Sequence, residues 1–246
     1  MNRNSSFSYL CNACGRCCHD KVITLSPYDV LKIARVANLT TREAMRRYTI
    51  RRGSILRFRD DGGCGALDGV RCGLHRGHPL ACRLYPLGIE RNANGTLEKF
   101  VTLEPAAGSL GVFGDDSTVN EFLRAQGAGP HLEANARYAS LLPVFRERVA
   151  VLVDFSRVEP REFWRRAVRE ALAESGFDEN PLIDAMFDAD GANSEAPDDA
   201  DAVVTHVERL KQMIGDETNP DILAAAAVML AVSLGYAPSE VVSPSC

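Results

Sequence analysis

The sequence predicts a mostly helical α+β protein in two parts: a cysteine-rich N-terminal module with a small β-hairpin, then a helical C-terminal region. Three observations lead to this prediction, the first being that seven of the eight cysteines fall within the first 82 residues. An Asn-Gly pair at residues 94–95, a strong hairpin signal, separates two short apolar-rich runs. From residue 118 onward, apolar residues recur at helical spacing. We therefore expect the two parts to span residues 1–105 and 106–246.

Local signals predict two helices early in the chain. Ser26 is expected to cap the first helix and Pro27 to occupy its first position, where a missing amide hydrogen costs nothing. Asp29 complements the positive end of the same helix. Thr40 is expected to cap a second, short helix over residues 44–48.

Strands are expected in three places. Residues 55–59 alternate apolar and basic side chains, which is typical of a strand. Residues 87–91 and 97–103 are expected to form the hairpin around the Asn-Gly pair. The remaining segments of this half are expected to be loops: residues 1–25, 60–86 and 106–114.

The C-terminal part is expected to be helical, with one interruption. The helical segments are residues 118–125, 131–155, 160–175, 181–187, 202–214 and 220–234. Pro143 should kink or divide the second of these. Residues 188–201 are acidic and rich in turn formers, so we expect a solvated acidic linker there. Their spacing does not fit a calcium-binding loop.

Length and composition narrow the class of protein. A chain of 246 residues with 46% hydrophobic residues can bury a core without crosslinks, so its cysteines are not needed as staples. The polar first nine residues predict no secretory leader and a cytoplasmic location, where thiols stay reduced. The longest apolar run, residues 222–234, is shorter than the roughly 20 residues that a membrane span needs. We expect that run to form a buried helix.

Charge is divided between the two halves. Residues 1–91 carry a net charge of +9 and residues 92–246 one of −14. Nearby cations lower the pKa of thiols and so favour the thiolate form. The basic part could attract an anionic partner, or the two halves could attract each other, and the sequence leaves both possibilities open.

Four cysteines form the run Cys11-x-x-Cys14-x-x-Cys17-Cys18. Two thiolates separated by two residues can turn back onto one metal, as in zinc and iron–sulfur proteins. Gly15 lies inside this loop, where a positive φ angle can be needed. The adjacent Cys17 and Cys18 are expected to point in different directions, and so to serve two metals or two corners of one cluster.

Three further cysteines, Cys64, Cys72 and Cys82, lie near turn-forming glycine or proline residues. We predict that all seven clustered cysteines are metal ligands. Seven thiolates exceed the four that one tetrahedral zinc or one 4Fe–4S cluster uses, so spare thiols or a second centre are expected. A 4Fe–4S cluster is the favoured cofactor, with zinc or mononuclear iron as alternatives. Inert buried thiols and disulfides are the competing interpretations, and Cys246 is expected to be an exposed tail thiol.

The N-terminal part resembles a known family, the CxxCxxCC cysteine-cluster family, also called YkgJ-type. The resemblance covers about residues 7–103 and is carried by CNACGRCC (11–18), CGAL (64–67), CGLH (72–75) and HPLACRLYPLG (78–88). The family is described as a zinc- or iron-chelating domain, and flagellin lysine N-methylases carry a similar domain. The resemblance implies metal chelation by the cysteines. It gives only weak support for methyl transfer, because the helical remainder of the chain does not match the methylases.

Some residues of the resembling segment depart from the family or have two interpretations. The family usually has Arg-Pro where this chain has His78-Pro79, so His78 and His75 are either extra ligands or proton carriers, or polar loop residues. Arg83 lies in the family's CRxYP segment, and we predict that it binds a cofactor, namely a small anionic cosubstrate beside the metal. The alternative is that Arg83 donates hydrogen bonds to loop carbonyls.

Other residues are expected to have structural roles. His131 and His206 are isolated in the sequence and expected at the surface, whereas Trp164 is expected to anchor the core. The Tyr85-Pro86 bond could be cis. The sequence contains no GxxxxGK phosphate loop, no GxGxxG after a strand and no CxxxCxxC run of the radical S-adenosylmethionine type.

Three functions remain open at this point. The first is an iron–sulfur protein that supports a modification or redox reaction, including methyl transfer to a protein. The second is a zinc-stabilised protein-interaction module, and the third is an iron-handling protein. We expect a protein substrate or partner and a small anionic cosubstrate, with no membrane and no nucleic acid. The sequence does not decide whether the protein is an enzyme.

Overall fold

The computed structural model describes residues 1–91, 98–172, 180–190 and 198–236. Within these ranges the fold is α+β and mostly helical, with the cysteine-rich part first and helices after it, as the sequence predicts. No helix in the described ranges has both the length and the apolar character needed to cross a membrane.

The first two helices begin where their caps predict. The Ser26 side chain accepts a hydrogen bond from the Asp29 amide, and the Asp29 carboxylate accepts one from the Ser26 amide, which together form a capping box at the start of α1 (Pro27–Ala37). Thr40 caps α2 (Thr41–Tyr48) in the same way. In each capping box the two side chains accept hydrogen bonds from amides that would otherwise have no partner at the helix start. This explains why both helices start at these residues.

Two strands lie wholly or partly in segments that the sequence predicted to be loops, residues 1–25 and 106–114. β1 (Ser6–Leu10) pairs antiparallel with β8 (Val112–Thr118), with Tyr9 opposite Phe113. The prediction was wrong here because the partners are far apart in the sequence. In addition, the Gly-Asp-Asp run at 114–116 has low strand propensity.

The predicted hairpin is confirmed by its two strands. β6 (Leu87–Arg91) pairs with β7 (Glu98–Thr102), while the Asn-Gly turn within 92–97 lies outside the described residues. The strand expected over 55–59 is limited to β3 (Ile55–Leu56). The remaining short elements of this half are β2 (Thr49–Ile50), β4 (Leu67–Asp68), β5 (Arg71–Cys72), the 3₁₀ turns η1 (Arg16–Cys18), η2 (Arg51–Gly53) and η3 (His75–Gly77), and α3 (Leu80–Leu84).

The C-terminal part is helical, as predicted. Its helices are α4 (Val119–Ala125), α5 (Gly129–Ala139), α6 (Leu141–Leu152), α7 (Pro160–Leu172), α8 (Pro181–Ala185), α9 (Asp199–Asp216) and α10 (Pro220–Ser233). The predicted helix over 131–155 is divided at Ser140, and Pro143 lies in the first turn of α6, where proline is tolerated. Residues 173–175 of one predicted helix and 191–197 of the predicted linker lie outside the described residues.

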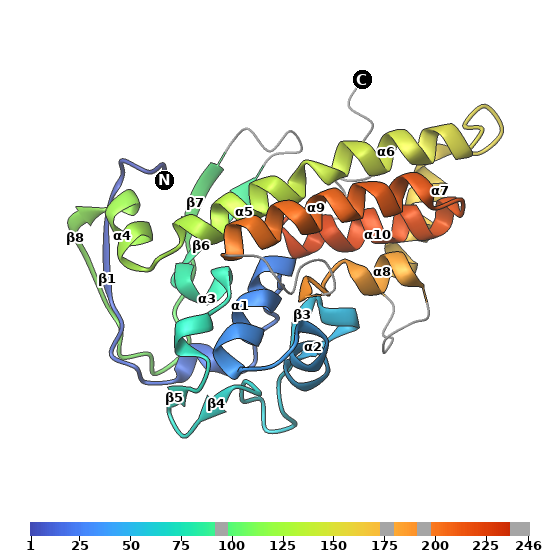
Figure 1. Cartoon of the computed structure of the whole chain (residues 1–246). Coiled ribbons are helices and arrows are strands. Elements are labelled where there is room, and N and C mark those ends of the chain that lie inside the picture. Colours follow the sequence, from blue (N-terminus) through green and yellow to red (C-terminus); the bar gives the residue numbers. More distant parts are fainter. Residues whose placement is uncertain (92–97, 173–179, 191–197, 237–246) are drawn as a thin grey trace.

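The helices form layers around one main core. Figure 1 shows α5, α6, α9 and α10 running side by side above α1 and α2, with the β1–β8 ribbon at the far end. The main core contains buried side chains of α1 and α2 together with those of α5 to α10, and α10 is buried around its circumference, as expected for residues 222–234. A second, smaller core lies under α3, β6, β7 and α4. The division at residue 105 stays a prediction, although the main core contains side chains from both sides of it.

Acidic residues near α8 and α9 contact the basic N-terminal helices. The buried Asp188 carboxylate accepts hydrogen bonds from the Thr41 hydroxyl at 2.8 Å and the Arg42 guanidinium at 3.0 Å. Asp199 forms an ion pair with Lys32 at 2.7 Å. The expectation of a solvated linker is therefore wrong for these carboxylates, because they pair with polar and basic side chains of α1 and α2. These contacts favour attraction between the two halves of the chain.

The buried carboxylate of Asp188 should contribute measurably to stability. Asp188→Asn is expected to lower the free energy of unfolding by roughly 2 kcal/mol, because it weakens charge-assisted hydrogen bonds to two partners. Urea denaturation followed by circular dichroism measures this change. The matched control is Glu133→Gln on the exposed face of α5, which should change the free energy by less than about 0.5 kcal/mol. Equal effects of the two substitutions would contradict this assignment.

Candidate metal centre

The first cysteine motif follows β1 and ends in the turn η1. Gly15 precedes that turn with a φ of 73°, as its position in the motif suggested. Cys11 is exposed, whereas Cys14, Cys17 and Cys18 are partly buried. The sulfur atoms of Cys17 and Cys18 lie 3.9 Å apart. The expectation that these two side chains diverge is therefore wrong, because the tight 3₁₀ turn brings their sulfurs together.

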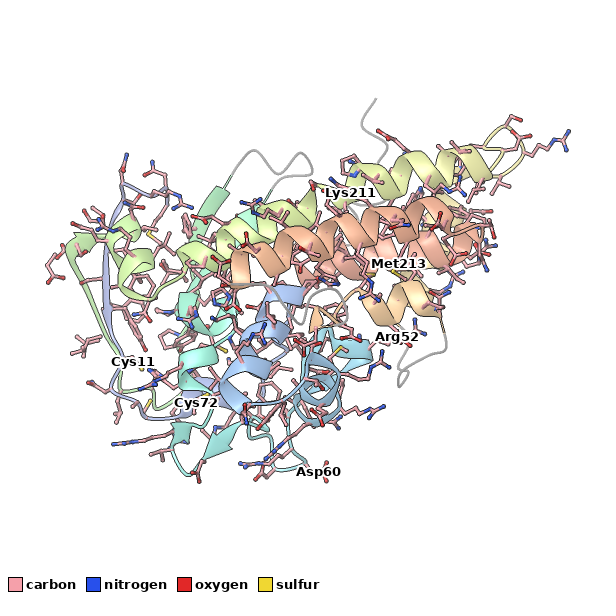
Figure 2. All side chains as sticks on the ribbon, viewed as in Figure 1. Cys11, Arg52, Asp60, Cys72, Lys211 and Met213 are labelled. Carbon is pink, nitrogen blue, oxygen red and sulfur yellow. The ribbon has the colours of Figure 1, made fainter. Side chains whose placement is uncertain are left out.

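The backbone ties the second motif to the first. The Cys64 amide donates to the Cys18 carbonyl at 2.8 Å, and the Asp20 amide donates to the Gly62 carbonyl at 2.9 Å. Cys72 lies in β5, directly opposite Leu67 of β4. Figure 2 labels Cys11 and Cys72, which lie at the same end of the molecule. The two motifs, separate in the sequence, thus meet through main-chain hydrogen bonds.

Cys82 joins this group from the short helix α3. Its pKa is raised by burial first, and then by the neighbouring Cys64 and Cys72 thiols. Burial likewise raises the pKa of Cys64 and of Cys72. These mutual effects place the thiols in one neighbourhood, because charges interact over several ångströms. We call the five cysteines concerned the inner group: Cys17, Cys18, Cys64, Cys72 and Cys82.

The inner group lies between the two hydrophobic cores. Cys64 belongs to the main core, and Cys18 and Cys72 pack against it. Leu80 and Leu84, on either side of Cys82 in α3, belong to the smaller core. Apolar surroundings disfavour bare thiolates, so a bound cation would be needed to keep several of these groups ionised together.

The glycine-rich loop predicted over residues 106–114 contacts the first motif. The Leu110 amide is the largest contribution that lowers the pKa of Cys14, and the Asn12 side-chain amide donates to the Leu110 carbonyl at 2.6 Å. Gly111 packs so closely that a Cβ atom there would lie 1.9 Å from the Tyr9 hydroxyl oxygen. The glycine richness of this segment was the available signal, because close packing of backbone against a site favours glycine.

The pKa values of Cys17 and Cys18 are shifted in opposite directions. The Cys18 thiol donates to Cys17 and lowers the pKa of Cys17 to about 6, with smaller contributions from Lys21 and His19. The same hydrogen bond, followed by burial, raises the pKa of Cys18 well above its ordinary value. One proton is therefore shared by the pair at neutral pH, with the thiolate on Cys17.

This sharing predicts a distinct pH dependence in metal-free protein. Because the pKa of Cys17 is lowered, its thiolate is present above pH 6, and its rate of alkylation by iodoacetamide should level off near pH 7. Cys64 and Cys72, whose pKa values are raised, should react faster only above about pH 9. Peptide mass spectrometry gives each rate.

A matched variant tests the cause of this acidity. Cys18→Ala removes the donor, so the Cys17 profile should move to higher pH by at least one unit, toward an ordinary thiol. A Cys17 rate that already climbs between pH 7 and 9 in the unaltered protein would contradict the assignment.

The chemistry of the donor set, which consists of cysteine thiols, suits a soft metal ion. All seven cysteines in the described part of the chain are free thiols. Thiolates bind zinc and iron–sulfur clusters. However, no three cysteine, histidine or carboxylate side chains within residues 1–91, 98–172, 180–190 and 198–236 are placed to hold a single ion. The assignment of all seven cysteines as ligands stays a prediction.

Arg83 points its guanidinium at main-chain carbonyls. It donates to the carbonyl oxygens of His78 at 2.9 Å, Gln126 at 2.8 Å and Arg76 at 2.9 Å. It also donates to the imidazole of His131 at 3.0 Å. These contacts favour the interpretation of Arg83 as a structural donor, and its predicted binding of an anionic cosubstrate stays a prediction.

Two histidines predicted at the surface are buried. His131 is 2% exposed and His206 is fully buried. The His206 ring bonds to the Tyr138 hydroxyl at 2.8 Å and the Ala185 carbonyl at 2.7 Å. The prediction was wrong because the polar partners of both rings come from other elements, which no local sequence pattern reveals.

Three other residues or pairs have defined positions. The rings of His75 and His78 meet edge to face at 4.4 Å, and burial lowers the pKa of His78 to about 4, so this ring is neutral near pH 7. Their role as extra ligands stays a prediction. The Tyr85-Pro86 bond is cis. Trp164 is buried in the main core, which confirms its predicted role as an anchor.

The arrangement described so far is that of a thiol-rich segment that joins both cysteine motifs. Residues 10–102 match the family model CxxCxxCC, described as "Putative zinc- or iron-chelating domain". This match confirms the family resemblance of the cysteine-rich part and supports metal binding, while leaving α4 to α10 outside the match. A search of curated proteins and a search of solved structures gave no match.

Proposed function

We propose that this protein binds a metal centre through its clustered cysteines, and that the centre is an iron–sulfur cluster. The observation that carries the proposal is the inner group, in which thiols from both motifs gather at the boundary of two cores. The main-chain hydrogen bond from Cys64 to Cys18 ties the backbones of the two motifs together. The family match supports zinc or iron as the metal.

The number of clustered cysteines, seven, exceeds the four ligands that one tetrahedral zinc takes, which favours a larger centre over a single ion. Bond lengths of about 2.3 Å to a tetrahedral zinc place all four sulfurs within about 3.8 Å of one another. Cys17 and Cys18 come close to this separation at 3.9 Å, but no third donor in the described residues joins them at one ion. A cluster takes its thiolates on separate iron atoms, so its ligands stand farther apart. We propose that the inner thiols bind separate iron atoms in this way.

The reaction class that we propose is the modification or redox chemistry of a protein partner. Methyl transfer to a protein side chain is the specific form suggested by the flagellin lysine N-methylases, whose domain the N-terminal part resembles. An iron–sulfur centre would supply electron transfer or a binding position, and this chain would exclude water from it by the apolar packing of Cys64 and Cys82. Arg83 does not add support for an anionic cosubstrate, because its donors face carbonyls.

A zinc-stabilised interaction module is the second candidate function. The observation that favours it is the main-chain closure between residues 18–20 and 62–64, together with the short strands that follow. Elements of two residues have little stability of their own, and a structural zinc could supply it.

The deciding experiment is metal and sulfide analysis of full-length protein purified without oxygen. The proposal predicts iron and acid-labile sulfide in equal amounts, with a broad visible absorption that bleaches on reduction. Stoichiometric zinc without sulfide would establish the second candidate in its place. Protein that binds neither metal after anaerobic reconstitution would overturn both.

A further inference from the structure

A chain of three buried or partly buried polar side chains runs beneath the cysteine site. The Asp29 carboxylate in α1 bonds to Nδ1 of His131 in α5 at 2.7 Å. Nε2 of the same ring accepts a hydrogen bond from Nε of Arg83 in α3 at 3.0 Å. The side chains of His131 and Asp29 are only 2% and 3% exposed. Three helices far apart in the sequence thus meet at one imidazole.

The two neighbours fix the state of the His131 ring. Arginine keeps its proton under all ordinary conditions and can only donate, so Nε2 of His131 must be an acceptor. The ring proton then lies on Nδ1, where it is donated to the carboxylate. The arginine cation, the neutral imidazole and the carboxylate anion therefore follow one another along this line of side chains. Each buried polar atom in this line has a partner, which is what low solvent access demands.

The same groups hold α3 at both ends. The Leu80 amide, at the start of α3, donates to Oδ1 of Asp29 at 2.8 Å. At the other end of the helix, Arg83 is held by His131 and by the Gln126 carbonyl. Cys82 lies between these two anchors. A helix of five residues has little stability of its own, so these contacts determine where Cys82 stands.

We infer that His131 is a positioning residue for the cysteine site, which sets α3, and therefore Cys82, against the other inner thiols. His131 lies outside residues 10–102, so the matched family segment would depend on α5 to complete its own site. The consequence for a bound metal rests on the proposed function. The consequence for the position of Cys82 does not, and can be measured without any metal.

The test uses two conservative variants of the full-length protein. His131→Asn keeps a donor close to the position of Nδ1 but loses the contact with Arg83. His131→Gln keeps an acceptor close to the position of Nε2 but loses the contact with Asp29. The control is His206→Gln, which removes an equally buried histidine that bonds to Tyr138 and Ala185 in another part of the core.

The first measurement is the rate at which iodoacetamide alkylates Cys82 in metal-stripped protein. Loss of one buried hydrogen bond from the line should raise that rate about tenfold in each His131 variant, and by less than twofold in His206→Gln. A rate for Cys82 within twofold of the unaltered protein in both His131 variants would overturn the inference. An equal rise in the control would also overturn it, because it would indicate general loosening.

The second measurement is the metal-to-thiolate absorption of the same proteins after anaerobic reconstitution with iron and sulfide. We expect this band to weaken or shift in both His131 variants and to stay unchanged in His206→Gln. If the unaltered protein takes up no metal, the proposed function fails, while the alkylation rates still decide the role of His131. If metal binds to every variant with an unchanged band, the inference fails and the proposed function stands.

A third measurement needs no variant, and covers the case in which both substitutions prevent folding. In the unaltered protein, hydrogen exchange of the Leu80 amide should be at least about a hundredfold slower than in an unstructured peptide, because its acceptor is a buried carboxylate. Exchange close to the peptide rate would show that α3 is not held by Asp29, and would overturn the inference.

Discussion

Cys64→Ser is expected to reduce the metal content of the purified protein by at least roughly tenfold. A serine hydroxyl is a hard, protonated group and does not replace a thiolate on zinc or iron–sulfur. Cys64 is the cysteine that the structure buries in the main core and bonds directly to the backbone of Cys18. Metal analysis by mass spectrometry, on protein purified without oxygen, measures the loss.

The matched control for this substitution is Cys246→Ser. Cys246 lies outside the described residues, and the sequence sets it apart from the cluster. Its replacement should therefore change the metal content by no more than about 10%. Equal losses from the two changes would indicate that the protein loses metal through general instability. The proposed ligand set would then be wrong.

Removal of the metal is expected to make transient opening of the loops around the site more frequent, and to leave the helical core closed. Ligation free energy is also folding free energy in such segments, so a chelator should remove about 4 kcal/mol of stabilisation where the metal had been present at about a thousand times its dissociation constant. Residues 11–20 and 58–78 contain only two-residue strands and 3₁₀ turns, so they should become sensitive to protease. α1 and α10 should stay protected, because both contribute buried side chains to the main core.

Limited proteolysis with peptide mapping, before and after chelation, checks this distribution. The internal control is the ratio of cleavage within 58–78 to cleavage within α10. A ratio that does not change on chelation would contradict the coupling between metal and local fold. Cleavage that rises equally everywhere would show that the metal stabilises the whole protein and not this region.

Local signals in the sequence predicted the elements whose determinants are local. Ser26 and Thr40 sit next to the amides that they cap, so the starts of α1 and α2 could be read directly from residue type. The hairpin β6–β7 and the long helices follow from turn chemistry and hydrophobic period in the same way. The cysteine spacing indicated the family of the N-terminal part because the CxxCxxCC run is a local pattern, and residues 10–102 match that family's model.

Features that depend on contacts between distant segments could not be predicted. The β1–β8 ribbon pairs residues about a hundred positions apart, and neither strand has a strong pattern of its own. His131 is polar in a helix of mixed character, and only the arrival of Asp29 and Arg83 explains its burial. The close sulfurs of Cys17 and Cys18 depend on a 3₁₀ turn that residue spacing does not specify.

The two readings of Arg83 illustrate the same limit within the candidate site. Its place beside Cys82 suggested a cofactor contact, and its alternative role as a donor to carbonyls was equally compatible with the sequence. The carbonyls of Arg76, His78 and Gln126 come from two separate loops, so the choice between the readings needed the fold. The sequence likewise left open whether the basic half attracts an external partner or the acidic half of the same chain. The contacts of Asp188 and Asp199 with α1 and α2 favour the second possibility.

X-ray absorption spectroscopy at the metal edge of full-length, anaerobically purified protein tests the central claim, that thiols of both cysteine motifs bind one metal centre. The account predicts a shell of sulfur neighbours around the metal, with a second shell of iron atoms if the centre is an iron–sulfur cluster, and a reduced sulfur shell in both Cys17→Ser and Cys72→Ser. A shell of only oxygen and nitrogen neighbours, or a sulfur shell that changes in neither variant, would contradict it.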